Sequence, residues 1–423
     1  MRVICINRFF WPDHSATSQL LTDLAFHLAA KGNAVTGNAV TGDAVTGNAV
    51  TVITGRQLYG DAQAVLAPFE IEAGVAIVRV WSTRFGRAGL PGRALDYVSF
   101  YVSAFWVLLW RVQADDVVLA KTDPPMLSVV TALLARLKRI HGVRVYRVNW
   151  LQDLFPEVAQ AAGIGIVRGA AGATLQRLRD WSLRGATNVV LGERMAALLS
   201  SRGVSRLTVV PNWADGAAIE PERAVPNPLR VAWQLQGKFV IGYSGNLGRV
   251  HDAAAIIGAA ERLRGDAGVV FLFIGSGKES EALRADVESR GLSNVLFQPY
   301  QPRDLLGQSL TLPDVHLVSL RPVFEGFVVP SKFYGIAAAG RPCVFIGDAD
   351  GEIARLLREG ESGLTVPDGD GAALAEAILG LRNNPARAKA MGTAARRMFE
   401  ARFDRPVALA RWDAVLAEAA GVS

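Results

Sequence analysis

A lysine stands at the start of a short run of small residues in the last third of the chain. In VVPSKFYGIAAAGRP, residues 328–342, Pro330 fixes the direction of entry and Ser331 is a residue type that commonly caps helices. Lys332 then falls in the first helical turn, where the helix dipole disfavours a cation. A bound anion would offset that penalty, whereas a lysine that bends away into water explains the same residues without a ligand. The segment predicts one of these two arrangements.

A glycine-containing turn is the second candidate for anion binding. In YSGNLGRVHD, residues 243–252, an expected strand passes into a helix, and Gly245 and Gly248 permit a tight turn with close backbone approach. Asp252 is placed to cap the helix that comes next. Such junctions present backbone N–H groups to phosphates, although many of them hold glycines for turn geometry alone. The turn matches neither the Walker A pattern nor G-x-G-x-x-G.

Apolar runs of strand length alternate with helical stretches in two series, which predicts two doubly wound α/β domains with parallel sheets. The first series has expected strands at 3–7, 50–54, 116–120 and 143–148 and helices near 16–31 and 127–140. The second has expected strands at 239–245, 269–275, 295–300, 315–320 and 343–347 and helices near 252–264 and 279–290. The proline-rich segment 209–228 between the two series is the expected linker.

The composition is that of an ordinary globular protein with an excess of basic residues. Of 423 residues, 50% are hydrophobic and 20% are charged, and the formal net charge is +6. That excess suits nucleotides, phosphates or an acidic membrane surface. The sequence has no zinc-finger spacing and no long basic run, so we expect no nucleic-acid partner. Cys5 and Cys343 lie in apolar runs, and MRVICIN does not resemble a signal peptide, which together favour a cytosolic location.

Four near-identical units of five residues run from Asn33 to Gly55 in NAVTGNAVTGDAVTGNAVTVITG. A period of five fits neither a helix nor a common solenoid repeat. We interpret residues 33–47 as three added units in a helix-to-strand connection, because surface loops accept insertions at a small entropic cost. A functional flap is the alternative.

An aromatic run, YVSFYVSAFWVLLW at 97–110, carries no charge. It is too short to span a bilayer, which needs about 20 residues. Aromatic residues with polar tips favour the membrane–water boundary, and the basic stretches 136–147 and 177–184 could add attraction to an anionic surface. The run predicts either a buried core helix or a helix that lies shallowly on a membrane.

Together these segments resemble the GT-B glycosyltransferases, specifically the retaining family 4 (group 1) and its branch of colanic acid and O-antigen biosynthesis. WPDHSATSQLLTDLAFHLAAKG, joined to NAVTVITG, resembles the N-terminal loop, helix and second strand of that family. VVPNW resembles its entry into the second domain, and YSGNLGRVHD its first phosphate turn. VVPSKFYGIAAAGRPCVFIGDADGEIARLLREGESGLTVP resembles the donor-binding core, and RFDRPVALARWDAVLAEA the terminal helix. The resemblance covers nearly the whole chain.

The resemblance implies a GT-B fold of two Rossmann-like domains that face each other across a cleft. The expected parts are an acceptor-side domain at 1–215, a nucleotide-sugar domain at 216–400, and a helix at 401–423 that returns toward the first domain. The implied reaction is transfer of a sugar, with retention, from a UDP-, GDP- or dTDP-sugar to a lipid-linked oligosaccharide on a polyprenyl diphosphate. Such an enzyme, of EC class 2.4, would lie peripherally at the cytoplasmic face of the cell membrane and need no metal or cofactor.

The same resemblance assigns roles to residues of the second domain. Lys332 and the amides behind it would hold the leaving diphosphate, and Glu325 would contact hydroxyl groups of the donor sugar. Pro299 and Tyr300, in PYQPRDL, would pack around the nucleobase. The expected phosphate-binding set comprises Gly245, Asn246, Gly248, Arg249, His251 and Ser331.

Two segments of the first domain come directly after strand ends, where ligands meet open parallel sheets. His14 and Ser15, in WPDHSATS, would touch donor phosphate or acceptor, although a solvated histidine is an equal alternative. Asp153, in VNWLQDLFPE, would orient the acceptor hydroxyl or balance charge at the anomeric carbon. Helix capping by Asp153 is the alternative.

The chain departs from the family pattern in its phosphate turn. Asn246 and His251 occupy positions where much of the family has arginine and lysine. We therefore expect Arg249 and Lys332 to supply the positive charge.

A second departure concerns the two glutamates that the family usually keeps. Gly335 stands at the position of the ribose glutamate, as in the surface-polysaccharide branch. Spacing from Gly340 would put the sugar contact at Phe327, so the assignment to Glu325 needs a shift of two residues.

Two other functions share this architecture. A nucleotide-sugar 2-epimerase needs the donor site but neither an acceptor nor a membrane. A non-catalytic subunit that keeps the fold for partner binding is consistent with the absence of a glutamate at Gly335.

Overall fold

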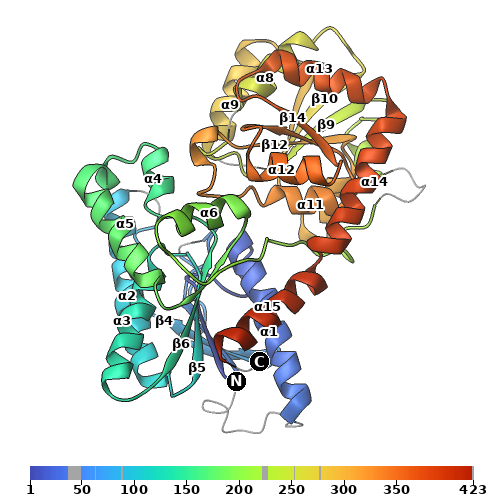
Figure 1. Ribbon diagram of the computed structural model, residues 1–423. Helices are drawn as coiled ribbons and strands as arrows, with labels where there is room; N and C mark the ends of the chain where they lie inside the picture. The colour runs from blue at the N-terminus through green and yellow to red at the C-terminus, as the bar shows by residue number, and fades with distance from the viewer. Residues whose placement is uncertain are drawn as a thin grey trace. The chain divides into compact units, whose positions relative to one another are not determined.

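The computed structural model forms two compact units (Figure 1). Unit 1 contains Met1–Val210 and Leu409–Ser423, and unit 2 contains Pro211–Ala408. The division between them falls in the segment that the sequence suggested as a linker. The structure describes residues 1–36, 49–61, 63–86, 89–221, 227–251, 253–275 and 278–421.

Unit 1 is built on a sheet that has eight strands in the described residues, in the order β3-β4-β2-β1-β5-β6-β7-β8. Neighbouring strands pair in parallel except β3 and β4, which pair antiparallel. The strands are β1 (Val3–Ile6), β2 (Val50–Gly55), β3 (Phe69–Glu72), β4 (Val75–Val80), β5 (Asp116–Ala120), β6 (Val145–Leu151), β7 (Thr187–Val190) and β8 (Leu207–Val209).

Helices cover both faces of this sheet, as parallel strands that are apolar throughout require. Figure 1 shows α2, α3 and α5 on one face and α1 and α15 on the other. The helices are α1 (Ala16–Thr36), α2 (Leu90–Arg111), α3 (Leu127–Ile140), α4 (Glu157–Ala161), η1 (Gly165–Val167), α5 (Gly169–Leu183), α6 (Glu193–Ser201) and α15 (Arg405–Ala419), of which the part from Leu409 belongs to unit 1.

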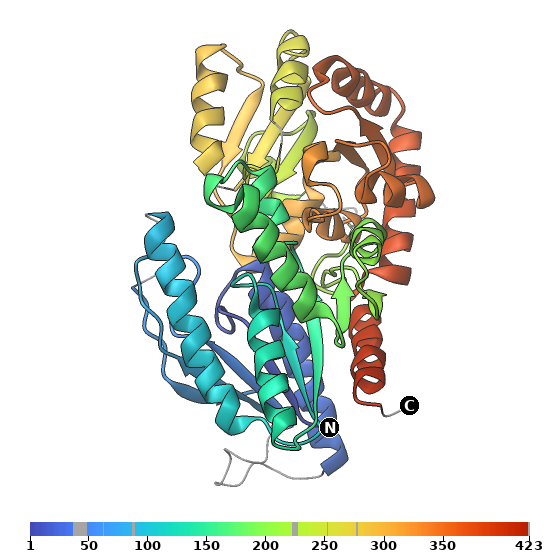
Figure 2. The same ribbon diagram turned by 60° about the vertical axis from the view of Figure 1, so that its left-hand side comes forward.

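Helix α2 contains the aromatic run, and it has both a buried and an exposed apolar face. Phe100, Ala104 and Leu108 are fully buried against β1, β5 and α3. On its other side, five apolar side chains spaced by three or four residues are more than half exposed. We call this set the α2 stripe: Leu95, Val98, Val102, Trp106 and Trp110. In Figure 2, α2 stands at the edge of unit 1 beside α3.

The alternative of a core helix therefore holds for one side of α2, whereas contact of the exposed side with a membrane stays a prediction. Within the described ranges, none of the helices combines the length and apolar composition needed to cross a bilayer.

Unit 2 has a parallel sheet whose described strands run in the order β11-β10-β9-β12-β13-β14. Its strands are β9 (Phe239–Ser244), β10 (Val269–Ile274), β11 (Val295–Gln298), β12 (Val315–Ser319), β13 (Cys343–Ile346) and β14 (Gly363–Val366). The strand order reverses its direction of growth between β9 and β12, which is where ligands bind in sheets of this kind.

The helices of unit 2 also lie on both faces of the sheet. Side chains of α8, α9 and α13 form one core with β9, β10 and β12, and Leu229 and Leu312 pack with β9 and β10 on the opposite face. The helices are α7 (Pro228–Ala232), α8 (Ala254–Arg262), α9 (Lys278–Ser289), η2 (Arg303–Leu305), α10 (Leu306–Thr311), η3 (Pro322–Phe324), α11 (Lys332–Ala338), α12 (Glu352–Glu359), α13 (Gly371–Arg382) and α14 (Pro385–Arg402).

Two doubly wound α/β sheets confirm the fold class expected from the sequence. Every expected strand is present, and the expected helix at 127–140 matches α3 residue for residue. Helix α1 runs five residues further than expected, to Thr36, because the first repeat unit continues it. The rest of the repeat, from 37 to 48, and the proposed capping residue Asp252 lie outside the described residues.

Candidate functional site

Lys332, the first residue of α11, reaches back to the turn after β9. Its ammonium donates hydrogen bonds to the phenol oxygen of Tyr243 (2.5 Å) and to the carbonyl of Asn246 (2.7 Å). Nζ also lies 3.4 Å from Nε2 of His251 and 4.0 Å from the centre of the Tyr243 ring. The lysine and the glycine turn, which are more than 80 residues apart in sequence, therefore meet within unit 2. The alternative of a lysine that bends away into water is wrong.

Gly245 is required where the lysine crosses the turn. Its φ of +108° lies in the region that side-chain-bearing residues avoid. A Cβ at this position would stand 2.9 Å from Cε of Lys332. The turn after β10 adds a second constraint, because a Cβ on Gly275 would stand 2.6 Å from the Gly245 carbonyl oxygen. Backbone and lysine fit together here only because both positions lack side chains.

Hydrogen bonds and burial together set the protonation of His251 and Lys332. Nδ1 of His251 lies 2.6 Å from the carbonyl oxygen of Ser319, so it carries the proton and donates, and Nε2 accepts from the lysine. Burial, together with the positive charge of Lys332, lowers the pKa of His251 to about 3. Burial lowers the pKa of Lys332 to about 7. A bound anion would restore the protonated lysine, which is the form that can stabilise negative charge.

The first turn of α11 differs from the expectation. Ser331 occupies the N-cap position, but its side chain makes no capping hydrogen bond. The amides of Phe333 and Tyr334 donate to the carbonyls of Pro330 and Ser331, each at 3.3 Å. The expected capping by Ser331 is therefore wrong, and these two amides are engaged within their own turn. The ammonium, more than the end of this seven-residue helix, is the group that can hold an anion.

The remaining residues of the phosphate turn lie at the surface. Asn246 and Arg249 are exposed, and a side chain added at Gly248 would meet nothing within 4 Å. The turn after β9 is thus accessible to a ligand on the side away from Gly245.

Pro299 and Tyr300 come directly after β11, at the edge of the sheet. Both are exposed, and 54% of Tyr300 is accessible to solvent. An exposed aromatic ring next to a strand end is a suitable surface for a planar base. Their role in nucleobase packing stays a prediction.

Glu325 has a structural contact that the sequence did not suggest. Its Oε2 accepts a hydrogen bond of 3.3 Å from the amide of Glu352, the first residue of α12. A Cβ on Gly351, the N-cap of that helix, would stand 2.3 Å from Oε1 of Glu325. A carboxylate is favourable at the beginning of a helix. This position holds Glu325 near the start of α12, and its contact with the donor sugar stays a prediction.

In unit 1, the loop after β1 holds its own polar groups. The amide and hydroxyl of Ser15 donate to Oδ1 of Asp13 at 2.8 and 2.5 Å. His14 is exposed, and its carbonyl accepts a hydrogen bond from the side chain of Gln19. The structure places His14 at the surface and ties Ser15 to Asp13, so a ligand contact by Ser15 would have to share its hydroxyl.

Asp153 lies just after β6 and lines a pocket of about 380 Å³ that lies wholly within unit 1. Asp153 is itself exposed to solvent, but the protein packed around its carboxyl, together with the charge of Asp123, raises the pKa of Asp153 to about 6. The N-cap position of the next helix, α4, belongs to Pro156, and no side chain caps it. The alternative that Asp153 caps this helix is therefore wrong, and the residue faces a ligand-sized space.

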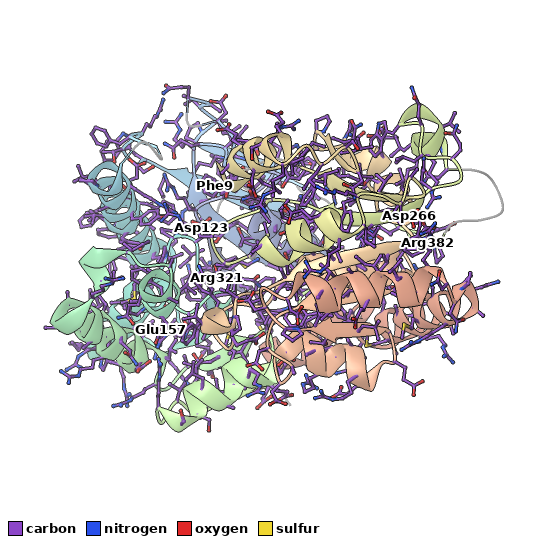
Figure 3. All side chains as sticks on the ribbon, turned by 90° about the horizontal axis from the view of Figure 1, so that it is seen from above. Phe9, Asp123, Glu157, Asp266, Arg321 and Arg382 are labelled. Carbon is purple, nitrogen blue, oxygen red and sulfur yellow. The ribbon has the colours of Figure 1, made fainter. Side chains whose placement is uncertain are left out.

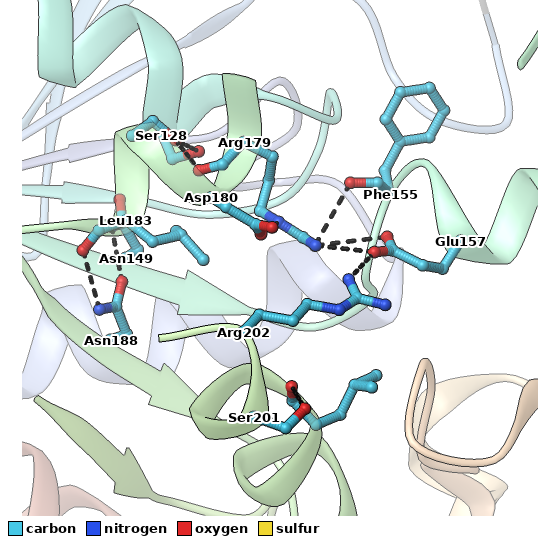
Figure 4. A network of polar contacts seen from close by, with 12 residues as sticks. Ser128, Asn149, Phe155, Glu157, Arg179, Asp180, Leu183, Asn188, Ser201 and Arg202 are labelled. Atoms are coloured by element: carbon cyan, nitrogen blue, oxygen red, sulfur yellow. Dashed lines mark hydrogen bonds and ion pairs between the residues drawn. The ribbon is translucent and has the colours of Figure 1, made fainter. Parts of the chain in front are cut away.

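The wall behind this pocket is braced by a buried ion-pair network (Figure 4). A guanidinium nitrogen of Arg179 lies 2.7 Å from Oε1 of Glu157, and Arg202 pairs with the same oxygen. Arg179 also donates to the carbonyl of Phe155. Burial by itself raises the pKa of Glu157, but the two arginines hold this pKa below its usual value. The network fixes α4 against α5.

Sequence reasoning missed two participants, Tyr243 and Ser319. Both stand at the carboxyl ends of strands, β9 and β12, next to the point where the strand order reverses. A tyrosine directly before the glycine turn was a usable signal for the first. The Ser319 carbonyl carried no signal, because any residue offers a backbone oxygen.

Comparison with solved structures shows which fold the chain has. Over its full length the chain has the fold of a sucrose-phosphate synthase from Thermosynechococcus elongatus, with a TM-score of 0.74 and 16% identity, covering 100% of both chains. A structure of Anabaena Alr3699/HepE in complex with UDP-glucose matches with a TM-score of 0.70 and 14% identity, over 99% of this chain and 100% of that one. The fold is GT-B.

The family is defined by the sequence comparisons. Residues 238–384 match the family described as Glycosyl transferases group 1, so the part of unit 2 that holds Lys332 is a domain of that family. WbjE of Pseudomonas aeruginosa, named a probable glycosyltransferase, is 28% identical over 63% of this chain. The Escherichia coli (strain K12) protein WcaI, whose name assigns it to colanic acid biosynthesis as a glycosyl transferase, is 31% identical over 62% of this chain.

These alignments span 66% and 65% of the lengths of the two relatives. Both alignments thus cover slightly less than two thirds of a protein that is named as a glycosyltransferase. The predicted resemblance to the group 1 glycosyltransferases is confirmed for residues 238–384.

Proposed function

We propose that the protein is a retaining glycosyltransferase that moves a sugar from a nucleotide diphosphate sugar to a lipid-linked acceptor in the biosynthesis of a bacterial surface polysaccharide. The observation that carries the proposal is the position of Lys332. Its ammonium lies against the glycine turn at the switch point of the sheet, inside the group 1 glycosyltransferase domain.

Lys332 would act on the leaving group. As the bond between the anomeric carbon and the diphosphate oxygen breaks, negative charge grows on the diphosphate, and a fixed cation lowers the energy of that state. The ammonium now donates to Tyr243 and Asn246. A diphosphate oxygen would replace one of these acceptors, and its charge would keep the lysine protonated. The acceptor hydroxyl oxygen would bond to the anomeric carbon on the same face and lose its proton.

Other residues would bind the donor around this cation. Arg249 and Gly248 are exposed at the turn, and Tyr300 offers an aromatic surface for the base. A structural neighbour was solved with UDP-glucose, which supports a nucleotide sugar as donor and leaves UDP-, GDP- and dTDP-sugars as candidates. We expect no metal, since the cation of Lys332 would take over charge neutralisation.

The acceptor side would belong to unit 1. Asp153, with a pKa near 6, could take a proton from the acceptor hydroxyl or orient it, and His14 would touch acceptor or donor from the loop after β1. Glu325 would leave its contact with α12 to reach a sugar hydroxyl.

The α2 stripe supports a peripheral position at the inner face of the cell membrane. Its five side chains are apolar and exposed, and two of them are tryptophans, which favour the boundary between lipid and water. Among residues of α2 and α3, Arg93, Arg136 and Arg139 are exposed, and the acidic residue of α2, Asp96, is buried. Apolar insertion and attraction to anionic lipids would act together.

The decisive experiment measures transfer directly. Purified protein is incubated with radiolabelled UDP-, GDP- or dTDP-sugars and a bacterial membrane lipid extract, and label in the organic phase is counted. We expect label from one donor class in the wild type and about one hundredth of the rate in Lys332→Ala. Isomerised free nucleotide sugar, with no label in lipid, would instead identify a 2-epimerase. Nucleotide binding without either product would identify a non-catalytic subunit.

A further inference from the structure

A pocket in unit 1 is lined mainly by apolar side chains, although Lys121, Asn149 and Asp153 also line it. We call it the apolar pocket: it has a volume of about 380 Å³ and lies between the ends of β5 and β6 and the helices α2 to α5. Leu127, Leu154, Phe155, Val158 and Ile164 are among its walls. The walls that these five side chains form suit a hydrocarbon better than a sugar, which needs hydrogen-bond partners along its whole outline.

A second, polar pocket shares a wall with the first. We call it the arginine pocket, because Arg8, Arg84 and Arg93 line it. Arg93 and Tyr97 line both pockets, so the two adjoin at these side chains. The guanidinium carbons of Arg8 and Arg93 lie 5.3 and 5.6 Å from the centre of the Tyr97 ring. The tyrosine therefore holds two cations at the boundary between an apolar and a polar space.

The charge in the arginine pocket is positive. Its carboxylates are Asp96 and Asp123, against three arginines; Asp123 and Phe9, which also lines the pocket, are labelled in Figure 3. Asp96 is buried and already compensated, since it accepts from the hydroxyl of Thr83 at 2.8 Å and from the amide of Phe85 at 3.0 Å, and pairs with Arg8. Arg84 and Arg93 are exposed. An anionic group fits this side better than a neutral one.

Taken together, the two pockets match a ligand with a hydrocarbon chain on one side and an anionic head on the other. We propose that they form one site for an amphiphile whose chain packs on the apolar walls of the first pocket, away from Asp153, and whose phosphate or diphosphate binds the arginines. The α2 stripe continues the apolar surface outward, because Ala94 lines the pocket and Leu95 and Val98 beside it are exposed. A chain longer than the pocket would leave along this helix toward lipid.

This inference rests on the proposed function, since such an amphiphile is the lipid diphosphate end of a lipid-linked acceptor. It adds the place where that end binds and the residues that recognise it. The phosphate end would be held by Arg84 and Arg93, and the first part of the chain by Val158 and its neighbours.

Binding of farnesyl diphosphate tests the site, with farnesol and inorganic diphosphate as partial ligands. The full chain is used in the Lys332→Ala background, so that the proposed donor site does not take up the diphosphate. We expect calorimetry to give an affinity for farnesyl diphosphate at least about tenfold above that of either partial ligand. Burial of the chain should also give a more negative heat-capacity change than inorganic diphosphate gives. Equal affinities for farnesyl diphosphate and inorganic diphosphate would overturn the proposal.

Substitutions separate the two halves of the site. Val158→Trp should fill the apolar pocket and weaken farnesyl diphosphate binding about tenfold or more, without changing diphosphate binding. Ala161→Trp, on the same short helix but outside the pocket, is the matched control. Identical affinities in these two variants would contradict the assignment. Should Val158→Trp fail to fold, the heat-capacity comparison decides alone.

The head-group half is tested by charge. The double variant Arg84→Ala and Arg93→Ala should weaken farnesyl diphosphate binding about tenfold, abolish most of its salt dependence and leave farnesol binding nearly unchanged. Arg177→Ala, an exposed arginine of α5, is the control and should bind as the parent does. Unchanged binding in the double variant would remove the arginines from the site.

The result is distinguishable from a failure of the proposed function. If sugar transfer to lipid is unaffected by Val158→Trp at low acceptor concentration, the proposed transferase function stands and the pocket assignment is contradicted. Pocket-dependent binding of farnesyl diphosphate in a protein that transfers no sugar would support the pocket assignment and contradict the proposed function.

Discussion

Units 1 and 2 both place candidate site residues at the carboxyl ends of parallel strands, yet the surroundings of these residues differ. In unit 2, the turn after β9 brings the ammonium of Lys332 among a phenol, a carbonyl and an imidazole. In unit 1, the ends of β5 and β6 line the apolar pocket together with Asp153 and apolar side chains. The strand arrangement is shared, so it cannot be the source of the difference.

The difference lies in the segment that comes after each strand. After β9, Gly245 leaves room for a lysine that comes from a distant helix. After β6, the loop that holds Leu154 and Phe155 and the short helices α4 and η1 instead place apolar side chains over the strand ends. One fold thus supplies the position of a site, whereas local turns and helices decide its chemistry.

Removal of the cation of unit 2 should have the largest effect. Lys332→Ala should reduce kcat of sugar transfer about 10²-fold, because one charge-stabilising group at the leaving diphosphate is lost. Steady-state rates with the labelled donor measure this. Lys389→Ala, an exposed lysine of α14, is the control and should keep the wild-type rate. A normal rate in Lys332→Ala would mean that unit 2 carries no functional cation here, and the contrast with unit 1 would be lost.

The depressed pKa of Lys332 gives a second test. Since the free lysine has a pKa near 7 and the bound diphosphate would raise it, nucleotide binding must take up a proton above pH 7. Affinity for the nucleotide diphosphate should therefore fall by up to about tenfold per pH unit above pH 7, and change little on this account below it. Calorimetric titrations at several pH values measure the slope. Lys332→Met should bind weakly and without that slope; a slope that persists in this variant would assign the titration to another group.

Glycine at position 245 is the feature that admits the lysine, so its removal tests the proposed origin of the difference between the units. Gly245→Ala would carry a side chain at positive φ, which costs on the order of 1–3 kcal/mol, and would crowd Cε of Lys332. We expect Tm to fall by about 2–8 °C and nucleotide binding to weaken. Gly265→Ala, whose added methyl group meets nothing within 4 Å and which lies outside the proposed site, should retain both properties. Equal behaviour of the two variants would show that the crossing of lysine and turn is not a constraint.

The two tryptophans of the α2 stripe in unit 1 can be replaced without changing buried core residues. The double variant Trp106→Ser and Trp110→Ser should weaken binding to vesicles containing anionic phospholipid by about tenfold or more, because exposed apolar area is lost, while thermal stability stays near wild type. Trp81→Ser, which removes a similarly exposed tryptophan elsewhere in unit 1, serves as the control. Vesicle sedimentation gives the partition constants, and a loss equal to that in Trp81→Ser would separate α2 from the membrane.

The smallest effect is expected from the repeat. Deletion of residues 33–47 shortens α1 by its last four residues and leaves Asn48 and Ala49 to join Gly32 to β2. Folding and transfer activity should be almost unchanged, because a surface connection is shortened at a small entropic gain. Circular dichroism and the transfer assay measure both. Loss of folding would make the repeat part of the structure of unit 1, which would then differ from unit 2 in more than its site.

Much of the fold was accessible from the sequence because its signals are local. Apolar runs such as FVIGYS and VVFLFI are buried along nearly their whole length, which is what a parallel sheet covered on both faces requires. The turn chemistry at Gly245 was also visible. Strands β3, β4, β7, β8 and β14 were not expected. FEIE at 69–72 is short and partly exposed and carries too few apolar residues to stand out, whereas VAIVRV at 75–80 did carry a strand signal that went unrecognised.

Only part of the candidate site could be predicted from the sequence, for a different reason. Lys332 and the glycine turn could be singled out separately by their unfavourable or permissive local geometry. Ser331 was misjudged, since a residue type favoured at caps made no capping bond, and the amides behind it were engaged in their own turn. Glu325 was assigned to the sugar by pattern, whereas its contact with the start of α12 depends on packing between segments far apart in sequence.

The order of residues was enough to set the alternation of strands and helices, the positions of the glycines that need unusual backbone angles, and the family of the second domain, because each depends on a few neighbouring residues. Two outcomes required the folded chain: Lys332 meets Tyr243 and His251, and α2 is buried on one side and exposed on the other. Both depend on which surfaces, distant in sequence, come into contact. The burial that lowers the pKa of Lys332 arises only when these surfaces have packed together.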